Sequence, residues 1–325
     1  MLSVIIPVHN GEKHISKCLD AILDSSYYNY EIIVISDASQ DKTDCIVLKY
    51  SSVFFIRNER NRGASYSRNK GAIYAKGDIL VFLDSDVVVF KDTLKKIAEN
   101  FEKSSIDAVF GLYDYETPVN NFISKFKNLQ HHYIHLRNKG KIKTFWTGCG
   151  AIKKNIFNKV GGFDENIGFM EDINLGHKLS QNHFSTVLDL RILCQHLKNY
   201  TFRSFVKSEL YGRAIPWSRL ILDKKAPINC LNTDIRNVFS ILTLFLMCGC
   251  IFLTIFSLRW LFILPFLLII ILFLNFGFLH YIIKKKGVKF SFLSYWILLV
   301  HYFLAGFGAF VAFIEYLLNR TRRKQ

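Results

Sequence analysis

Short apolar runs alternate with amphipathic segments over the first 200 residues of the chain. The apolar runs predict strands at residues 3–6, 31–35, 53–56, 79–83 and 108–112. Apolar side chains at helical spacing predict helices between the strands, at Ile15, Leu19, Ile22 and Leu23 and at residues 63–75 and 92–101. A series of this kind is typical of an α/β fold with a mostly parallel sheet, in which ligands bind at the carboxyl ends of the strands.

The last third of the chain has a different pattern. Residues 238–258, 260–283 and 292–314 form three apolar runs, and none of them contains Asp, Glu, Lys or Arg. A membrane-spanning helix needs about 20 apolar residues, so all three runs are long enough to cross a bilayer. The pattern therefore predicts two or three transmembrane helices within residues 238–325.

The charges beside these runs predict an orientation. The loop 284–289 carries four lysines, and the positive-inside rule places it, together with the domain before residue 238, in the cytosol. We therefore expect an integral protein of a bacterial inner membrane or a plasma membrane. A third span would export the basic tail 320–324. Either that tail is tolerated outside, or the third run, with Gly306 and Gly308 at its centre, re-enters or lies at the interface.

The net charge of +16 is concentrated near the apolar runs. From residue 238 onward nine basic residues accompany the single acid Glu315, and such charge favours anionic lipid headgroups. No basic stripe interleaved with aromatic residues occurs in the N-terminal part, so no nucleic-acid partner is expected. Half of the residues are hydrophobic, which excludes a disordered chain, and the seven cysteines lack Cys-x-x-Cys spacing, which favours a reducing compartment.

Aromatic and basic residues alternate in the segment 200–221. Such a mixture is typical of a helix in the headgroup plane, although the segment could equally pack on the soluble domain. We therefore divide the chain into a soluble domain at 1–205, an amphipathic linker at 206–237 and a membrane region at 238–325.

Acidic residues follow two of the predicted strands directly. Asp37 comes after the run 31–35, and Asp84 and Asp86 come after the run 79–83. Two carboxylates at the mouth of a buried strand can hold a hard divalent cation such as Mg²⁺ or Mn²⁺ together with substrate phosphates. A solvated turn or a helix cap would explain the same pair equally well.

Six motifs in order make the chain resemble a family 2 glycosyltransferase with the GT-A nucleotide-sugar-binding fold, over about residues 1–205. They lie at residues 3–10, 31–41, 61–71, 82–86, 161–165 and 171–175. The resemblance implies a nucleotide-sugar donor (a UDP-, GDP- or dTDP-sugar), held by Pro7, Asp37, Arg62, Gly63, Asn69 and Asp84. The family often has a second acid where this chain has Ser36, which leaves the nucleotide open. A helix beginning near Gly63 could also face phosphate oxygens, or Gly63 could simply start the helix.

The resemblance also implies the residues of the chemistry. Asp84, Asp86 and His196 would hold the divalent cation, although a lone histidine is more often a packed or surface residue. Glu171 and Asp172 match the family's acidic pair, with Asp172 as the base that takes a proton from the attacking hydroxyl. As helix-start charges the two acids would also be favourable without any catalysis. The loop 146–150 resembles the acceptor side of the family.

The absence of a Gln-x-x-Arg-Trp motif, which the processive synthases of this family carry, favours the transfer of one sugar per event. A membrane-bound enzyme of this kind implies a lipid-linked glycan or glycolipid as the acceptor, reached by an inverting displacement. One alternative acceptor is a polyprenyl phosphate. Another alternative is a transporter with a regulatory domain, but the first two apolar runs hold no ionisable residue apart from His280.

Overall fold

The computed structural model describes residues 1–102, 105–224, 226 and 234–322, which form two compact units, Met1–Asn199 and Tyr200–Gln325. The expected boundary at residue 205 lies within the first helix of the second unit, and residues 225 and 227–233 of the expected linker lie outside the described part. The six cysteines that the structure describes are all free.

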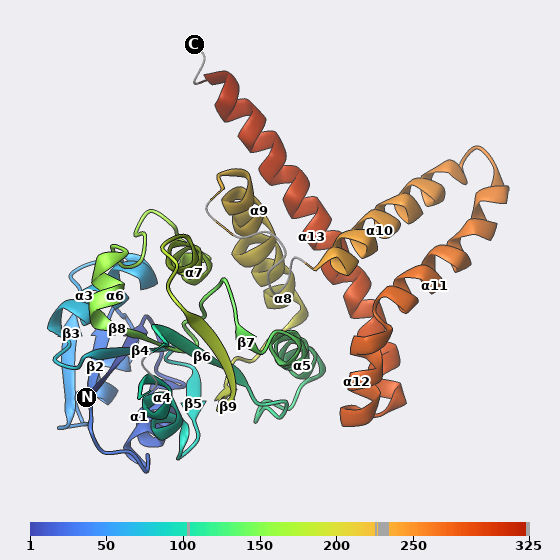
Figure 1. Cartoon of the computed structure of the whole chain (residues 1–325). Coiled ribbons are helices and arrows are strands. Elements are labelled where there is room, and N and C mark those ends of the chain that lie inside the picture. The colour runs from blue at the N-terminus through green and yellow to red at the C-terminus, as the bar shows by residue number, and fades with distance from the viewer. Residues whose placement is uncertain (103–104, 225, 227–233, 323–325) are drawn as a thin grey trace. The chain divides into compact units, whose positions relative to one another are not determined.

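The first unit is built on a nine-stranded mixed sheet in the order β3-β2-β1-β4-β8-β6-β9-β5, with β7 paired to β9 (Figure 1). Its strands are β1 Leu2–Val8, β2 Tyr30–Ser36, β3 Val53–Arg57, β4 Ile79–Leu83, β5 Val87–Val89, β6 Ala108–Tyr113, β7 Gly140–Lys141, β8 Cys149–Lys153 and β9 Thr186–His196. Strands β1 to β4 are parallel to one another, and β8 runs antiparallel between β4 and β6. The predicted α/β class is confirmed, and each of the five predicted strands is present.

Helices cover both faces of this sheet. They are α1 Ile15–Leu23, α2 Thr43–Val47, α3 Gly63–Tyr74, α4 Thr93–Phe101, α5 Phe122–Arg137, α6 Lys154–Lys159 and α7 Glu171–Gln181. Alternate residues of each buried strand contribute to two different cores. Val4 and Ile6 pack with α1 and α4, whereas Ile5 packs with α3, α6 and α7. Because both faces are covered, the strands read as unbroken apolar runs in the sequence.

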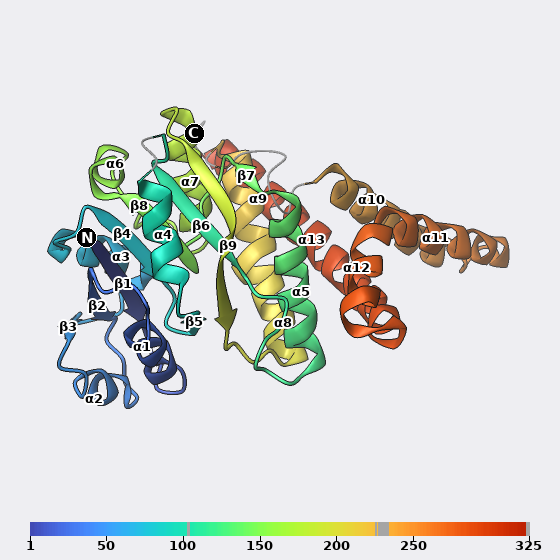
Figure 2. The ribbon, with the colours of Figure 1, turned by 60° about the horizontal axis from the view of Figure 1, so that its bottom comes forward.

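The described residues of the second unit contain helices and no strand. Its elements are α8 Phe202–Glu209, the π-helical turn η1 Leu210–Ala214, α9 Ile215–Leu222, α10 Ile235–Leu253, the 3₁₀ helix η3 Leu258–Ile263, α11 Leu264–Leu274, α12 Phe276–Lys286 and α13 Val288–Arg322. In both views α8, η1 and α9 form one continuous helical rod (Figure 2). A capping box of Thr201 and Ser204 starts this rod, and Asp234 caps α10 by accepting the Arg236 amide.

In the part of the chain that the structure describes, two single helices are long and apolar enough to cross a membrane, judged by length and composition. They are Ile235–Leu253 and the part Val288–Asn319 of α13. The second predicted run, 260–283, is not one straight helix, because the chain bends by 69° between Leu258–Leu274 and Phe276–Lys286. At this break the side-chain amide of Asn275 donates hydrogen bonds to the carbonyl of Ile271 and to the hydroxyl of Ser240. The helix is thus interrupted at a polar residue whose side chain bonds to the backbone of the preceding turn.

Candidate active site

The carboxyl ends of β1, β2 and β4 meet at one edge of the sheet, as the parallel register requires. Val8 is paired with Ser36, and the amide of Asp37 donates to the carbonyl of Val8 at 2.7 Å. Pro7 lies where β1 is paired only with β2, since the pairing with β4 ends at Ile5. Residues that follow β2 and β4 are thereby brought to the same edge, where ligands bind in sheets of this type.

Asp37 is buried, and its carboxylate accepts hydrogen bonds from three residues of its own domain. It accepts hydrogen bonds from the side chain of Asn58 at 2.8 Å and from the amides of Arg62 at 3.0 Å and Gly63 at 2.7 Å. Gly63 has φ of +87°, a conformation that glycine adopts without strain, and it begins α3. The helix start that we expected to face phosphate oxygens is thus held by the Asp37 carboxylate.

A buried arginine that sequence reasoning overlooked links two of the predicted motifs. Arg68 of α3 places Nη2 at 2.7 Å from Asp84 and Nη1 at 2.5 Å from Glu171. Its side chain is only 5% exposed. Burial raises the pKa of Asp84, and the guanidinium offsets this only in part. The acids that follow β4 and those that begin α7 are therefore joined through one charged group.

Asp86 and His196 form a second polar pair at the same edge. His196 ends β9, which pairs with β5, and its Nε2 lies 3.3 Å from a carboxylate oxygen of Asp86. Burial opposes ionisation of Asp86, but the charge and hydrogen bond of His196, together with Lys198, lower its pKa to about 2. Asp86 is thus a carboxylate at any physiological pH. No group of three or more His, Cys, Asp or Glu that could hold a metal ion occurs in the described ranges.

These two side chains suit a divalent cation that also binds substrate. An ionised carboxylate oxygen and an imidazole nitrogen are donors that Mn²⁺ accepts, and a magnesium or manganese site in such enzymes takes its remaining ligands from phosphates and water. Asp86 and His196 remain partly exposed, at 26% and 17% of their side chains. The donor set therefore fits a cation shared with a diphosphate.

Asp172 lies in the first turn of α7, next to Glu171. The residue before them, Met170, has φ of +66°, so the chain enters the helix through a left-handed turn. Burial and then the negative charge of Glu171 raise the pKa of Asp172 to about 7. A carboxyl group that ionises near neutrality is suited to act as a general base.

Asn69 connects α3 to the loop 161–165, which contains another of the predicted motifs. Its amide group donates to the carbonyl of Phe163 at 2.9 Å and its oxygen accepts the Phe163 amide at 3.0 Å. Glu165 of this loop also accepts from Asn69 and lies 3.7 Å from Arg62. Asn69 and Arg62 therefore position this loop in the structure.

An aromatic cluster surrounds His196 and was not expected. Its ring stacks on Tyr113 at 4.5 Å, and Tyr113 also contacts Trp146 at 4.8 Å and His131 at 4.4 Å. His131 in turn stacks on His135, one helical turn further along α5. Three histidines within residues 131–135 were the only sign of this cluster in the sequence. The loop 146–150 is thus connected through Tyr113 to the Asp86–His196 pair.

The predicted site residues fall into three connected groups. Asp37 binds the start of α3, Arg68 joins Asp84 to Glu171, and Asp86 pairs with His196. Sequence reasoning missed Arg68 and Asn58, although each lies within or beside a quoted motif. The roles assigned to the predicted residues stay predictions.

The sequence profile of Glycosyl transferase family 2 matches residues 3–161. An uncharacterized glycosyltransferase of Rickettsia typhi is 40% identical over 63 residues, which cover 19% of this chain and 20% of that protein. The O-antigen chain rhamnosyltransferase RfbN of Salmonella typhimurium is 24% identical over 232 residues, which cover 66% of this chain and 74% of that protein. The chain therefore matches only about a fifth of the length of the Rickettsia relative.

Solved structures share the fold. The mannosyltransferase PcManGT from Pyrobaculum calidifontis, in complex with GDP-Man and Mn²⁺, superposes with a TM-score of 0.59 at 16% identity and covers 95% of this chain and 86% of its own. Residues 1–349 of TarS from S. aureus, in complex with UDP-GlcNAc, superpose with a TM-score of 0.51 at 21% identity, covering 69% of this chain and 66% of that one. At sequence identities this low, the similarity to these two structures shows a shared fold alone.

Proposed function

From the premise that this chain is a family 2 glycosyltransferase with the GT-A fold, we propose that it transfers one sugar, with inversion, from a nucleotide-sugar donor to a lipid-linked acceptor, using a divalent cation. The observation that carries the proposal is Arg68, which holds the acids after β4 beside the acids that begin α7. The group that binds the cation and the base must both lie close to the anomeric carbon of the donor sugar. The contacts of Arg68 with Asp84 and Glu171 support this, because they hold the two sets of acids near each other.

Asp172 is proposed as the base. A sugar hydroxyl is a poor nucleophile at neutral pH, and a carboxylate in hydrogen-bond reach can accept its proton as the new glycosidic bond forms. The raised pKa of Asp172, about 7, supports this role. Attack from the side opposite the departing nucleoside diphosphate would invert the anomeric centre. Glu171, fixed by Arg68, keeps the helix start and hence Asp172 in place.

Asp86 and His196 are proposed to hold the cation, with Asp84 beside them. Such an ion stabilises the charge that develops on the leaving diphosphate. Asp37, oriented by Asn58 and the amides at the start of α3, is proposed to bind the nucleoside. PcManGT, which has the same fold, binds GDP-Man and Mn²⁺, and this supports a nucleotide sugar and a cation for this chain as well.

The acceptor is proposed to be lipid-linked because the unit that follows the catalytic one contains helices apolar enough to cross a membrane. A phosphate acceptor is already ionised and needs no base, so a functional Asp172 favours a hydroxyl on a lipid-linked glycan. The lysines at the end of α12, Lys284, Lys285 and Lys286, favour a cytosolic position for that loop and for the catalytic unit.

Donor turnover tests the proposal. The purified full chain, supplied with Mn²⁺, membrane lipid extract and UDP-, GDP- and dTDP-sugars in turn, should release nucleoside diphosphate with one donor and lose activity with a chelator. Asp86→Ala and Asp172→Asn should each abolish acceptor-dependent turnover. Asp78→Ala is the matched control, since Asp78 is 96% exposed and precedes β4 instead of following it.

Full activity of both site variants would refute the assignment of these residues. Mass spectrometry of the lipid product then separates an extended glycan from a sugar attached directly to a polyprenyl phosphate.

A further inference from the structure

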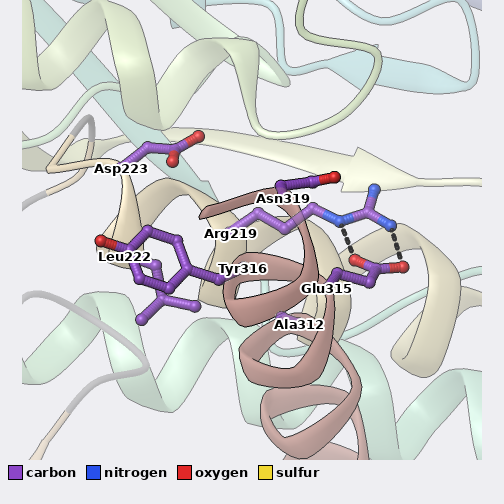
Figure 3. A pocket seen from close by; sticks show the side chains of 7 residues that line it. All are labelled: Arg219, Leu222, Asp223, Ala312, Glu315, Tyr316 and Asn319. Atoms are coloured by element: carbon purple, nitrogen blue, oxygen red, sulfur yellow. Dashed lines mark hydrogen bonds and ion pairs between the residues drawn. The ribbon is translucent and has the colours of Figure 1, made fainter. Parts of the chain in front are cut away.

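The helical rod α8–η1–α9 is held to α13 by two polar contacts. The Glu209 carboxylate, which is 2% exposed, lies 2.6 Å from Nδ1 of His301. Further along, Arg219 binds Glu315 through two parallel hydrogen bonds of 2.7 and 2.8 Å (Figure 3). A bidentate arginine–carboxylate pair fixes orientation as well as distance.

The two helices also touch between these contacts, where α13 has a glycine. A Cβ on Gly308 would lie 2.5 Å from the Cβ of Ala214, so the backbones approach closely there. His301, Gly308 and Glu315 are spaced seven residues apart and therefore lie on one face of α13. The contact partners advance in the same direction along both helices, so the rod and residues 301–315 run side by side and parallel.

The rod carries too many charges to lie in the hydrocarbon core. Its charged residues, apart from the buried Glu209, are Arg203, Lys207, Arg213 and Arg219, and Asp223 and Lys224 follow directly after its end. Charged side chains are rare in that core because leaving water is costly for each of them. The rod begins at Phe202, immediately after the catalytic unit ends at Asn199. It therefore lies at the membrane surface on the catalytic side.

We infer that α13 does not cross the membrane but lies in the headgroup plane on the catalytic side, with its apolar face towards the lipid. Residues 301–315 of α13 run parallel to the rod, so this part of the helix shares the depth of the rod. The inference rests on the proposed attachment of this enzyme to a membrane. It places the basic tail 320–324 on the same side as the lysines of α12, as the positive-inside rule prefers.

The exposed side chains of α13 suit this position. Large apolar residues recur at the spacing of one helical face, and all are between 39% and 60% exposed: Phe303, Phe307, Phe310, Ile314 and Leu317. This face lies opposite the stripe of His301, Gly308 and Glu315. An apolar face along one side and a polar attachment along the other are what an interfacial helix requires.

The part of the chain that crosses the membrane is then the hairpin of α10 and η3–α11. This hairpin extends away from a point near the middle of α13 (Figure 1). Both ends of this hairpin meet at Tyr302, whose hydroxyl lies 2.6 Å from Oδ1 of Asn275 and 3.1 Å from Oδ1 of Asn237. The 19 residues of α10 span about 28 Å, close to the hydrocarbon thickness. The bend of 69° after Leu274 then turns α12 away from the hairpin.

A cavity of about 380 Å³ between α9 and α13 agrees with this arrangement (Figure 3). Five of its seven lining side chains are polar or charged, namely Arg219, Asp223, Glu315, Tyr316 and Asn319. Such a lining is compatible with hydrated headgroups and unfavourable in hydrocarbon.

Protease protection of terminal tags tests the topology. The full chain carrying an N-terminal and a C-terminal epitope tag is examined in spheroplasts and in inside-out vesicles, with a third tag inserted after Ser257 at the hairpin tip. We expect the two terminal tags to be cleaved in the same preparation and the Ser257 tag in the other. Terminal tags on opposite sides would overturn the inference. Both terminal tags outside together would instead overturn only the cytosolic orientation.

Depth measurement provides a second test that does not depend on tags. Spin labels on genetically encoded amino acids at Phe303, Phe310 and Leu317 are placed in vesicles of phosphatidylcholine and phosphatidylglycerol. An in-plane helix gives the three labels one depth, whereas a span would separate the first from the last by roughly 21 Å along its axis. Labels at Ile235 and Phe252 of α10, both exposed, should differ in depth and act as the control. A progressive change of depth along α13 would refute the in-plane position.

Discussion

Replacing Arg68 by alanine is expected to destabilise the catalytic unit and to abolish transfer. The guanidinium holds Asp84 and Glu171, whose side chains are 34% and 13% exposed, at 2.7 and 2.5 Å. Removing one partner of a buried ion pair costs about 3–5 kcal/mol, because the remaining charge has no counter-charge. Water reaches Asp84 in part, so we take the lower end, about 3 kcal/mol.

Thermal unfolding of the full chain in detergent measures this loss. For a unit of about 200 residues, about 3 kcal/mol lowers the melting temperature by roughly 6–12 °C. Arg68→Lys keeps the charge but not the planar fork, and it should lose less stability while still lowering turnover. The double variant Arg68→Ala with Glu171→Gln should be more stable than Arg68→Ala alone, because one stranded carboxylate is removed. A melting temperature for Arg68→Ala within 2 °C of the unmodified chain would refute the reasoning.

Three further changes have defined outcomes. Because the pKa of Asp172 is raised to about 7, the ionised base is lost as pH falls, so kcat/KM should drop about tenfold per pH unit below 7; a flat profile down to pH 5 would exclude Asp172 as the base. Gly63→Ala should cost about 1 kcal/mol, since φ is +87° although a Cβ would meet nothing, whereas Gly168→Ala, with equal space and no positive φ, should be neutral in urea unfolding. Asn69→Ala should raise hydrogen exchange at the Phe163 amide at least tenfold, and unchanged exchange would show that other contacts hold that loop.

Strands β1 to β4 and β6 were predictable from the sequence, whereas β5, β7, β8 and β9 were not. Strands β1, β2 and β4 are mostly buried on both faces, so each appears as an apolar run. Strands β5 and β7 contain three and two residues, too few for any periodicity to show. The eleven residues of β9 alternate buried and partly exposed positions and include Asp189 and Arg191, which hides the strand from a search for apolar runs.

The candidate site was predictable only as far as strand ends reveal it. Carboxylates that follow an apolar run can be recognised in the sequence as candidate site residues, and Asp37 and Asp84 were found in this way. Arg68 does not, because its partners lie 16 and 103 residues away and only the fold brings them together. The bend after Leu274 was missed for a related reason: Asn275 is a single polar residue within an uncharged run, and its partner Ser240 lies on another helix.

The hydrogen bonds of Asp37 affect more than the stability of α3. A carboxylate offers about four acceptor positions, and Asn58, Arg62 and Gly63 supply three donors to them. In the proposed complex with the donor, the remaining position would accept a hydroxyl of the nucleoside. The side chain has already lost its rotational freedom when the protein folds, so the ligand does not have to order it. If Asp37 binds the nucleoside as proposed, its selectivity is geometric, because a ribose hydroxyl would have to approach from the direction that the three fixed donors leave open.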